Sequence, residues 1–594
     1  MNAPVNSTSR QCDVVIIGGG PGGATVASFL KLFQPQLNVI VVEREAFPRD
    51  HVGESQLPAV SKVLHEMGVW EKVEAAGFPI KLGASYTWGK TTEPWVFGFI
   101  PLSEVGSLAR PGKYEGWRQR VAFQVDRSKY DTILLEHAKS LGAQVLQPAR
   151  VAKIDFDSNS PGKPIRQVHL EDGATIQARY YVDASGNAAI LRRQLGVEVD
   201  APSLLKNVAF WDYWLAPNLN ESLLENGTMR VLIRSVSFGW IWYIVLSNDR
   251  TSVGLVCNAE YYKQSQQTPE QLYRRAIDEV PTIAERLKDA SRTEKLSATN
   301  DWSYVAKQSY GDNWFLVGEC LGFADPILAA GLTLTHTCAQ HCAYTILDLE
   351  RGQRDRAWLL DQYHQTQTRR IGQHIKFAEY WYSANGLFTE ILENCTAIAA
   401  QSGLQFSPQE AFRWLSHGGV DDIPGQFVIG GLGLSGIKSV QKRFAHTSAN
   451  EVTYFVDGKN TFDLNLSDAI QETMALPYQG AVHSAPVLVR GTARLPLTGF
   501  YGQVFTVLRS YRFIDQIVGA LQQLLASSGI QPQDRSSAIS GAFHCLESMV
   551  AQGWVQASHT EGRPALAMST PDEGEIVYTE RLGPTSLNPR RDSR

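Results

Sequence analysis

The chain begins with a pattern of apolar runs typical of buried parallel strands. Residues 13–17, "DVVII", form an apolar run after Asp13 that stops at a glycine-rich stretch, after which residues 25–33, "TVASFLKLF", have helical character. A second apolar run, "NVIVVE", ends at Glu43. Strand, helix and strand in this order predict a βαβ unit, and therefore an α/β fold built on a parallel sheet.

The turn between the first strand and the helix carries candidate chemistry. "GGGPGGA" places Gly18, Gly20 and Gly23 in G-x-G-x-x-G register, which permits a tight turn and lets backbone amides meet a pyrophosphate at the helix N-terminus. Glu43 stands where an acid would hold ribose hydroxyls. These features predict a dinucleotide site, whose candidate residues are Gly18, Gly20, Gly22, Gly23, Ala24, Glu43 and Arg44.

The order of the later segments indicates which dinucleotide is bound. Residues 127–142 predict a helix, followed by a strand from Ala143 and a hairpin that turns at Asp172-Gly173 and runs into Asp183. Much later, "WFLVGECLGFADPILAAG" predicts a buried strand that leads into a Gly-rich helix start. This order resembles the flavoprotein monooxygenase superfamily, and the resemblance implies a Rossmann-like FAD-binding fold with a β-sheet substrate region. The further FAD-binding residues that it implies are Ser55, Arg127, Asp183, Gly318, Glu319 and Pro326.

Three segments make the resemblance more specific. "FGWIWYIVL" contains Trp240 and Trp242 and resembles the W-x-W-x-I-P motif of flavin-dependent halogenases, and "HVGESQLP" resembles that family's G-E-S/A-x-x-P segment. Lys81, in "FPIKLGASYTWG", falls where the family keeps its catalytic lysine. The likeness favours the branch that acts on phenolic or carrier-tethered substrates.

The resemblance also implies a mechanism. Reduced FAD would react with oxygen to give a flavin hydroperoxide, chloride or bromide would attack it, and hypohalous acid would travel to Lys81. Halide is expected on the backbone of Ala330 and Gly331, and the pair Trp240 and Trp242 is expected to wall the path. No separate nicotinamide domain is apparent in the sequence, so FADH2 is expected from a separate flavin reductase. An electron-rich phenolic or tyrosyl group in secondary-metabolite biosynthesis, free or tethered to a carrier protein, is the leading substrate.

Simpler interpretations stand beside these. Two tryptophans two positions apart on a strand point to one face and usually pack in a core. Lys81 lies in a stretch that alternates apolar and small residues, as a half-buried strand does, and could lay its stem on apolar surface with its head in water. The departures from the family's pattern are Val245 for proline, Glu319 for aspartate, and Ala329-Ala330 in the serine region. A flavin-dependent aromatic hydroxylase and a non-catalytic FAD- or carrier-binding relative therefore remain alternatives.

Composition excludes several classes of partner. With 55 Lys and Arg against 60 Asp and Glu, the formal net charge is -5, and the absence of a dense basic run argues against nucleic acid. No segment approaches the roughly 18 apolar residues that a membrane span needs, and the start lacks a basic, then apolar leader, which predicts a cytoplasmic protein without membrane contact. The cysteines show no C-x-x-C spacing. "THTCAQHC", with His336, Cys338, His341 and Cys342, has helical ligand spacing, but without a second ligand cluster it favours core packing over a metal.

The C-terminal third loses the FAD pattern. We expect a catalytic domain over residues 1–385, ending in a long helix from about Arg354 to Ala384, and a mainly helical domain over residues 386–568. Apolar faces in "FIDQIVGALQQLLASSG" and "SGAFHCLESMVAQGWVQAS" suggest a winged-helix-like module, and "VTYFVDGKNTFDL" predicts a hairpin. This domain could be a lid or dock for a carrier-bound substrate, or plain scaffold. The polar residues 569–594 are predicted to be a disordered tail.

Overall fold

The computed structural model describes residues 9–89, 92–100, 102–224, 227–293, 296–299, 303–383, 385–390, 454–491, 493–527, 535–566 and 576–577. The chain forms two compact units. The first comprises Met1–Trp95, Ser103–Ser402 and Pro477–Val482, and the second comprises Val96–Leu102, Gly403–Leu476 and His483–Arg594. The expected domain boundary at residue 385 remains a prediction.

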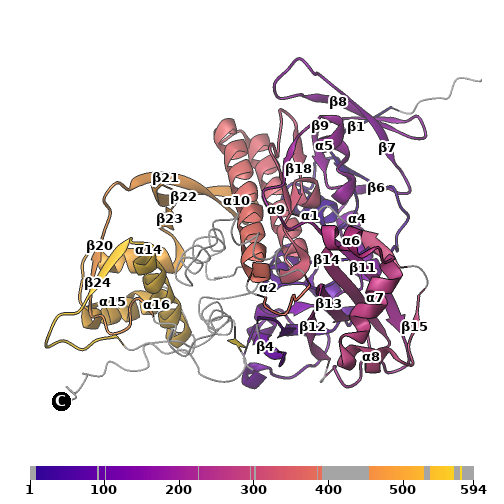
Figure 1. Ribbon diagram of the computed structural model, residues 1–594. Coiled ribbons are helices and arrows are strands. Elements are labelled where there is room, and N and C mark those ends of the chain that lie inside the picture. Colours follow the sequence, from indigo (N-terminus) through magenta and orange to yellow (C-terminus); the bar gives the residue numbers. More distant parts are fainter. Residues whose placement is uncertain are drawn as a thin grey trace, which may run out of the picture. The chain divides into compact units, whose positions relative to one another are not determined.

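The first unit contains a largely parallel sheet that confirms the Rossmann-like expectation (Figure 1). Its strand order is β6 (Gln144–Leu146), β2 (Val39–Val42), β1 (Ser9–Ile17), β9 (Thr175–Asp183), β8 (Ile165–Leu170) and β7 (Val151–Phe156), with β18 (Trp314–Leu316) also paired to β9. β1 pairs in parallel with both β2 and β9. The hairpin predicted at Asp172-Gly173 joins β8 to β9, with Gly173 at a φ of +87°.

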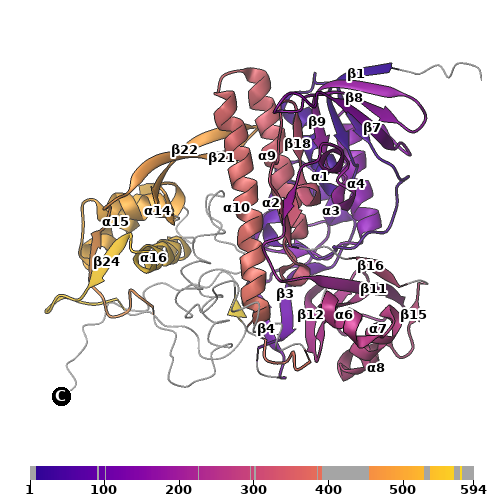
Figure 2. The ribbon, with the colours of Figure 1, turned by 45° about the horizontal axis from the view of Figure 1, so that its top comes forward.

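Helices cover this sheet. α1 (Pro21–Phe33) packs against α4 (Arg127–Ser140) and against α9 (Gly331–Arg351), and α9 lies beside the long helix α10 (Arg356–Ser383) in both views (Figures 1 and 2). Residues 14–17 of β1 and all of β2 are buried on both faces and can therefore be apolar, which is why the sequence pattern predicted these strands. Shorter helices complete this region: α2 (Pro58–Glu66), α3 (Trp70–Ala75) and α5 (Ile190–Gln194).

The first unit also contains a second, largely antiparallel sheet, and its expected role as the substrate region remains a prediction. Its strand order is β15 (Ser291–Arg292), β11 (Asn207–Leu215), β14 (Arg250–Asn258), β13 (Gly239–Val245), β12 (Thr228–Val236) and β3 (Ile80–Thr87), with β16 (Ser297–Thr299) beside β11 and β5 (Ala122–Phe123) beside β3. One face carries Ile241, Tyr243 and Leu255, which pack with α7 (Pro269–Asp278) and α8 (Pro281–Leu287) in a closed apolar core. The opposite face carries Trp240 and Trp242, because side chains alternate along a strand.

Smaller elements lie around these sheets. They are α6 (Ala259–Ser265), the strands β10 (Val199–Asp200), β17 (Tyr304–Ala306) and β19 (Gly322–Phe323), and the 3-10 turns η1 (Leu102–Glu104), η2 (Gly116–Arg120), η3 (Gly186–Ala188), η4 (Gly318–Cys320) and η5 (Pro326–Leu328). A further strand, β25 (Ile576–Val577), pairs in parallel with β4 (Trp95–Gly98). Within the described residues, no helix has both the length and the apolar character needed to cross a membrane.

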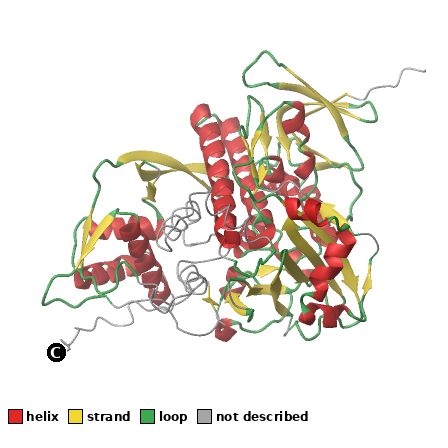
Figure 3. Cartoon of the chain, viewed as in Figure 1, coloured by secondary structure: helices red, strands yellow, loops and turns green. Residues whose placement is uncertain are grey.

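The second unit combines helices with strands (Figure 3). Its helices are α14 (Gly499–Leu508), α15 (Ile514–Ser527) and α16 (Arg535–Ala551), and its strands include β20 (Thr461–Leu464), β23 (Ala493–Pro496) and β24 (Val555–Ser558). Except for residues 477–482, which are part of the first unit, the longer strands β21 (Ile470–Tyr478) and β22 (Ala481–Arg490) also belong to it. Ile514, Ile517 and Leu521 of α15 lie in its core, as their spacing predicted. The expected tail, 569–594, lies outside the described residues except for β25.

The hairpin expected in "VTYFVDGKNTFDL" is wrong. β20 pairs instead with β24, and the described residues before it, 454–460, turn at Asp457-Gly458 and form no strand. The amides of Phe455 and Val456 donate to the two carboxylate oxygens of Glu547 on α16, both at 3.0 Å. A buried side chain thus takes the donors that a partner strand would have used, and local sequence gives no sign of it.

Candidate active site

The glycine turn after β1 leaves no room for a side chain at Gly18 or Gly23. Gly18 has a φ of +106°, and a Cβ there would lie 2.3 Å from the carbonyl oxygen of Ala184. A Cβ on Gly23 would lie 1.9 Å from the carbonyl oxygen of Gly18. Gly20 caps α1, and its carbonyl accepts from the amide of Ala24 at 2.9 Å. The turn therefore brings the N-terminus of α1 against the end of β1, as a pyrophosphate cradle requires.

Other glycines of this motif set the packing of neighbouring helices. A Cβ on Gly22 would lie 3.2 Å from Cγ2 of Thr335, so this glycine lets α1 approach α9 closely. Gly318 has a φ of +66°, and its Cβ would lie 3.0 Å from Oγ1 of the same Thr335. The first glycine motif and the late segment, far apart in sequence, thus meet at one point on α9.

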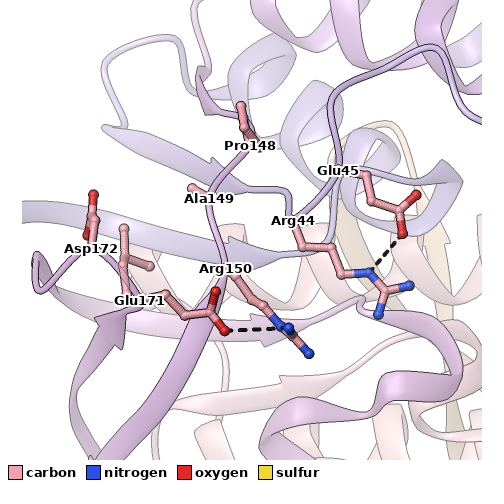
Figure 4. A pocket seen from close by; sticks show the side chains of 8 residues that line it. Arg44, Glu45, Pro148, Ala149, Arg150, Glu171 and Asp172 are labelled. Atoms are coloured by element: carbon pink, nitrogen blue, oxygen red, sulfur yellow. Dashed lines mark hydrogen bonds and ion pairs between the residues drawn. The ribbon is translucent and has the colours of Figure 1, made fainter.

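Glu43 and Arg44 follow β2 and have different surroundings. The carboxylate of Glu43 is buried and accepts from the amides of Gly19 at 2.6 Å and Glu45 at 2.9 Å. Arg44 is exposed and pairs with Glu45 at 3.1 Å. Arg44 and Glu45 line a pocket of about 540 Å³, together with Pro148, Ala149, Arg150, Leu170, Glu171 and Asp172 (Figure 4). The lining therefore includes the two residues that directly follow Glu43 in the chain.

Arg127 clamps the segment that leads to Ser55. Its guanidinium donates to both carboxylate oxygens of Asp131, at 2.7 and 2.9 Å, and to the carbonyl oxygens of Val52 at 2.8 Å and Gly53 at 3.3 Å. A guanidinium that donates to both oxygens of one carboxylate is held in a defined orientation. Arg127 therefore fixes the backbone before Ser55 relative to α4.

Asp183 and Glu319 lie in the late FAD region with different roles. Asp183 is buried and accepts from the amides of Leu191 at 2.8 Å and Arg192 at 3.2 Å and from the hydroxyl of Ser185 at 2.6 Å. These bonds cap α5, which favours a scaffolding role for Asp183 over direct contact with a cofactor. Glu319 is half-buried, and burial raises the pKa of its carboxyl group.

The candidate halide residues form the entry of α9. Pro326 begins the 3-10 turn η5, Ala329 adopts a left-handed φ of +54°, and the buried Ala330 is the N-cap of α9. Gly331 is the first residue of the helix, and a Cβ on it would lie 2.9 Å from the Phe323 ring. The N-terminus of a helix favours anions through its backbone amides and its dipole. The serine hydroxyl that the family pattern has here is not needed for that interaction.

Lys81 is fully enclosed, so the interpretation as a half-exposed surface lysine is wrong. All eight residues of β3 are buried, and Lys81 is only 2% exposed. Its Nζ donates to Oγ of Ser55 at 2.8 Å and to the carbonyl oxygen of Gln56 at 2.9 Å. Both of these acceptors are neutral, and burial lowers the pKa of the Lys81 amine to about 7. At neutral pH a large fraction of this lysine is therefore an uncharged amine.

A β-bulge aligns Lys81 with the tryptophan face. Lys81 pairs with Met229 on β12, but Gly83 pairs with the next residue, Arg230, so β3 holds one extra residue there. Further along, Ile233 pairs with both Tyr86 and Trp242. Without the bulge, positions 81 and 86 would point to opposite faces of the sheet, and with it they share one face.

Trp240 and Trp242 are held by different partners. Their ring centroids are 6.0 Å apart. The indole of Trp242 donates to Oγ of Ser252 on the adjacent strand at 3.1 Å, whereas the indole of Trp240 donates to the hydroxyl of Tyr382 on α10 at 2.7 Å. Trp240 belongs to an aromatic cluster of Tyr86, Trp88, Trp95, Trp240, Trp381, Tyr382 and Phe388.

The histidines and cysteines of "THTCAQHC" lie on α9 and make local contacts. The imidazole of His336 bonds to Thr25 and to Tyr130, both at 2.8 Å, His341 bonds to Gln367 at 2.9 Å, and Cys338 to Tyr363 at 3.2 Å. Burial lowers the pKa of His336 to about 3. In the part of the chain that the structure describes, no group of three or more His, Cys, Asp or Glu side chains is arranged to hold a metal ion.

Sequence reasoning missed three residues of this site: Tyr382, Asp325 and Gly254. Asp325 directly precedes Pro326, a candidate FAD-binding residue, so its carboxyl group was a visible signal. Gly254 interrupts the apolar strand "TSVGLVCN", and an isolated glycine in a strand often marks a close approach. For Tyr382 the sequence of α10 gives no sign, because only packing brings it to the tryptophan.

Gly254 lies directly under the ring of Trp242. A Cβ on Gly254 would lie 2.1 Å from Cζ2 of Trp242. We expect Gly254→Ala to displace this indole, to cost about 1–3 kcal/mol of stability through overpacking, and to reduce halogenated product per oxidised FADH2 by about tenfold. Thermal unfolding and product analysis check this. The double variant with Trp242→Phe should regain stability because the smaller ring relieves the contact. An unchanged single variant would contradict the prediction.

Comparison with known proteins identifies the class first. Residues 11–378 match the family model described as an FAD binding domain, so the chain is an FAD-binding flavoprotein. It is 32% identical over 389 residues to the 1H-pyrrole-2-carbonyl-[peptidyl-carrier protein] chlorinase of Pseudomonas fluorescens, covering 64% of this chain and 86% of that protein. It is 31% identical to the tryptophan 2-halogenase of Chondromyces crocatus, over 58% of this chain and 62% of that protein.

Solved structures agree with these sequence relatives. The myxobacterial chondrochloren halogenase CndH is 29% identical with a TM-score of 0.56, over 66% of this chain and 90% of that one. The flavin-dependent halogenase CmlS, at 20% identity, shares the fold with a TM-score of 0.68 over 96% of this chain and all of that one. The chain belongs to the flavin-dependent halogenase family, as an FAD-dependent halogenating oxidoreductase.

Proposed function

We propose that this halogenase takes FADH2 from a separate flavin reductase, oxidises chloride or bromide to hypohalous acid, and uses Lys81 to halogenate an electron-rich aromatic ring. The leading substrate is a phenolic or tyrosyl group, free or tethered to a carrier protein. The observation that carries the proposal is the buried amine of Lys81, which is held by Ser55 and Gln56 on the face that bears the tryptophan pair.

The residues around the glycine turn fit FAD. The turn at Gly18 and Gly23 has space only for backbone, Glu43 presents its carboxylate beside that turn, and Arg44 lines the pocket beyond it. Reduced FAD supplies the two electrons that, with dioxygen, halide and a proton, give hypohalous acid and water. Ser55, held in place through Arg127, links this cofactor region to Lys81.

The Lys81 amine gives the mobile oxidant a fixed position. Through hydrogen bonding it can hold and polarise hypohalous acid, or its nitrogen can attack the halogen. In the second case an N–halogen bond forms, the oxygen–halogen bond breaks, and water leaves. The aromatic ring then takes the halogen and loses a proton, which restores the amine. Burial favours attack by the nitrogen because it lowers the pKa of Lys81. Only the uncharged amine has the lone pair that the attack needs.

Two further parts of the site have proposed roles. The backbone at Ala330 and Gly331, at the N-terminus of α9, is the proposed halide site, because the backbone amides and the dipole at a helix N-terminus favour an anion. Trp240 and Trp242 are proposed to separate the organic substrate from the flavin. That separation would suppress direct hydroxylation of the ring.

Mass spectrometry of a substrate panel tests the proposal. The panel contains free and carrier-tethered phenols and a carrier-tethered pyrrole, since a relative is named for the tethered pyrrole. We expect a halogen isotope pattern only when FAD, NADH, a flavin reductase, oxygen and chloride or bromide are all present. An oxygenated product formed without halide would favour the hydroxylase alternative. Oxidation of NADH without added reductase would contradict the two-component proposal.

A further inference from the structure

A chain of hydrogen bonds leads from Trp240 to the late flavin segment. An indole nitrogen can only donate, so the hydroxyl of Tyr382 accepts from Trp240 at 2.7 Å and its own proton points to Oδ1 of Asp325, at 3.2 Å. The same Oδ1 accepts from the amide of Ile327 at 2.9 Å, and Oδ2 accepts from the side chain of Asn207 at 3.1 Å. The directions of the bonds from Trp240 to Tyr382 and from Tyr382 to Asp325 are therefore fixed.

This chain of hydrogen bonds is buried and joins four separate parts of the fold. Trp240 of β13, Tyr382 of α10, Asp325 before η5 and Asn207 of β11 are each less than 5% exposed. Figure 2 shows the C-terminal end of α10 beside β3. The partners of Asp325 are all uncharged, and burial raises the pKa of its carboxyl group to about 7. Burying a carboxyl group costs free energy unless hydrogen-bond donors satisfy its oxygens, as they do here.

Trp240 differs from Trp242 in where its support comes from. The partner of Trp242, Ser252, belongs to the adjacent strand of the same sheet. The residue opposite Trp240, Ser235, uses its hydroxyl to donate to the carbonyl oxygen of Thr87 instead. The indole of Trp240 therefore depends on α10 and on Asp325, which lies two residues after Phe323 and five before the candidate halide backbone at Ala330.

We propose that Asp325 and Tyr382 are positioning residues that tie the orientation of the Trp240 indole to the segment at the entry of α9, and thereby direct the oxidant to Lys81. This rests on the proposed function. The carboxyl group already has two donors without Tyr382, so the hydroxyl is not needed to satisfy it. The Tyr382 hydroxyl instead fixes the orientation of the Trp240 indole relative to the segment that leads to the candidate halide site at Ala330.

The test uses Tyr382→Phe and Asp325→Asn in the full-length protein. The matched control is Tyr243→Phe, because Tyr243 is also buried on β13 but faces the opposite side, where its hydroxyl donates to Asn220 at 2.9 Å. With FADH2 supplied, both test variants should retain flavin reoxidation within about twofold. Halogenated product per oxidised FADH2 should fall by at least about tenfold, and hydrogen peroxide should rise in its place. The control should behave as wild type.

A second measurement does not depend on catalysis. In protein labelled with 15N-tryptophan, the indole N–H resonance of Trp240, assigned with Trp240→Phe, should shift in both test variants and stay in place in the control. A resonance that moves with product yield unchanged overturns the role in directing oxidant. A yield that falls without any shift overturns the positioning role. If wild type halogenates no substrate, the proposed function fails, while the resonance still decides whether the chain positions Trp240.

Discussion

Replacing Lys81 by methionine or alanine is expected to lower halogenation by about 10²–10⁴-fold, the usual size of a lost acid–base or positioning group. FAD binding and reoxidation of reduced flavin should stay within about twofold, because Lys81 contacts Ser55 and Gln56 rather than the glycine turn. Methionine keeps most of the buried stem and limits the cavity. Product analysis and stopped-flow flavin absorbance measure the two effects separately.

The matched control for Lys81 is Lys31→Met. Lys31 is also a buried lysine, and its Nζ donates to the carbonyl oxygens of Pro35 and Leu37, away from the sheet that carries the tryptophans. It should change stability without changing the ratio of product to oxidised flavin. If Lys81→Met keeps normal halogenation, the proposed mechanism is wrong.

The pKa of Lys81 predicts a pH dependence in the wild type. Burial lowers this pKa to about 7, so the uncharged amine is the minor form below that pH and the major form above it. If the amine attacks the halogen, the rate of halogen transfer should rise as pH increases through about 7. Single-turnover product formation across this range checks the sign. A falling rate would favour the ammonium form as a hydrogen-bond donor to the oxidant.

Gly23→Ala is the second change with a large expected effect. Its Cβ would lie 1.9 Å from the carbonyl oxygen of Gly18, and neither backbone can move without separating α1 from β1. We expect FAD affinity to fall by about 100-fold or more, since the amides at the start of α1 lose their position toward a pyrophosphate. Flavin titration and the FAD content of the purified protein measure this.

Gly372→Ala is the matched control, because it shows whether any glycine-to-alanine change lowers FAD affinity. Gly372 lies in α10, and a Cβ there meets nothing within 4 Å. This variant should bind FAD normally and gain roughly 0.5–1 kcal/mol of stability, because alanine has the better helix propensity. Normal FAD binding by Gly23→Ala would overturn the role given to the turn.

The FAD-binding half was predictable because its signals are local. A buried parallel strand is apolar, Gly18 and Gly23 of the turn are required by backbone contacts under 2.5 Å, and Glu43 directly follows the second strand. The family and the α/β fold were therefore confirmed. Individual cofactor contacts remain predictions, and Asp183 shows why, since the same acid that resembles a cofactor ligand caps α5 in the fold.

The arrangement around Lys81 was only partly predictable. Its residue type and motif were visible, but alternation in "GFPIKLGASYTWG" suggested a half-exposed strand. Three neighbouring segments cover it instead: β5, β12 and the backbone at Ser55 and Gln56. That enclosure, rather than the lysine itself, gives the amine its lowered pKa.

The sequence by itself determined the strand–turn–helix that receives a dinucleotide, the positions of the motif residues, and the family. Each depends on residues close together in the chain or on backbone space that only glycine leaves. The tertiary structure alone decided that a one-residue bulge aligns Lys81 with Trp242, and that Tyr382 and Asp325 hold Trp240. These contacts join residues that are far apart in sequence, and their geometry depends on strand register and helix packing, which no local pattern encodes.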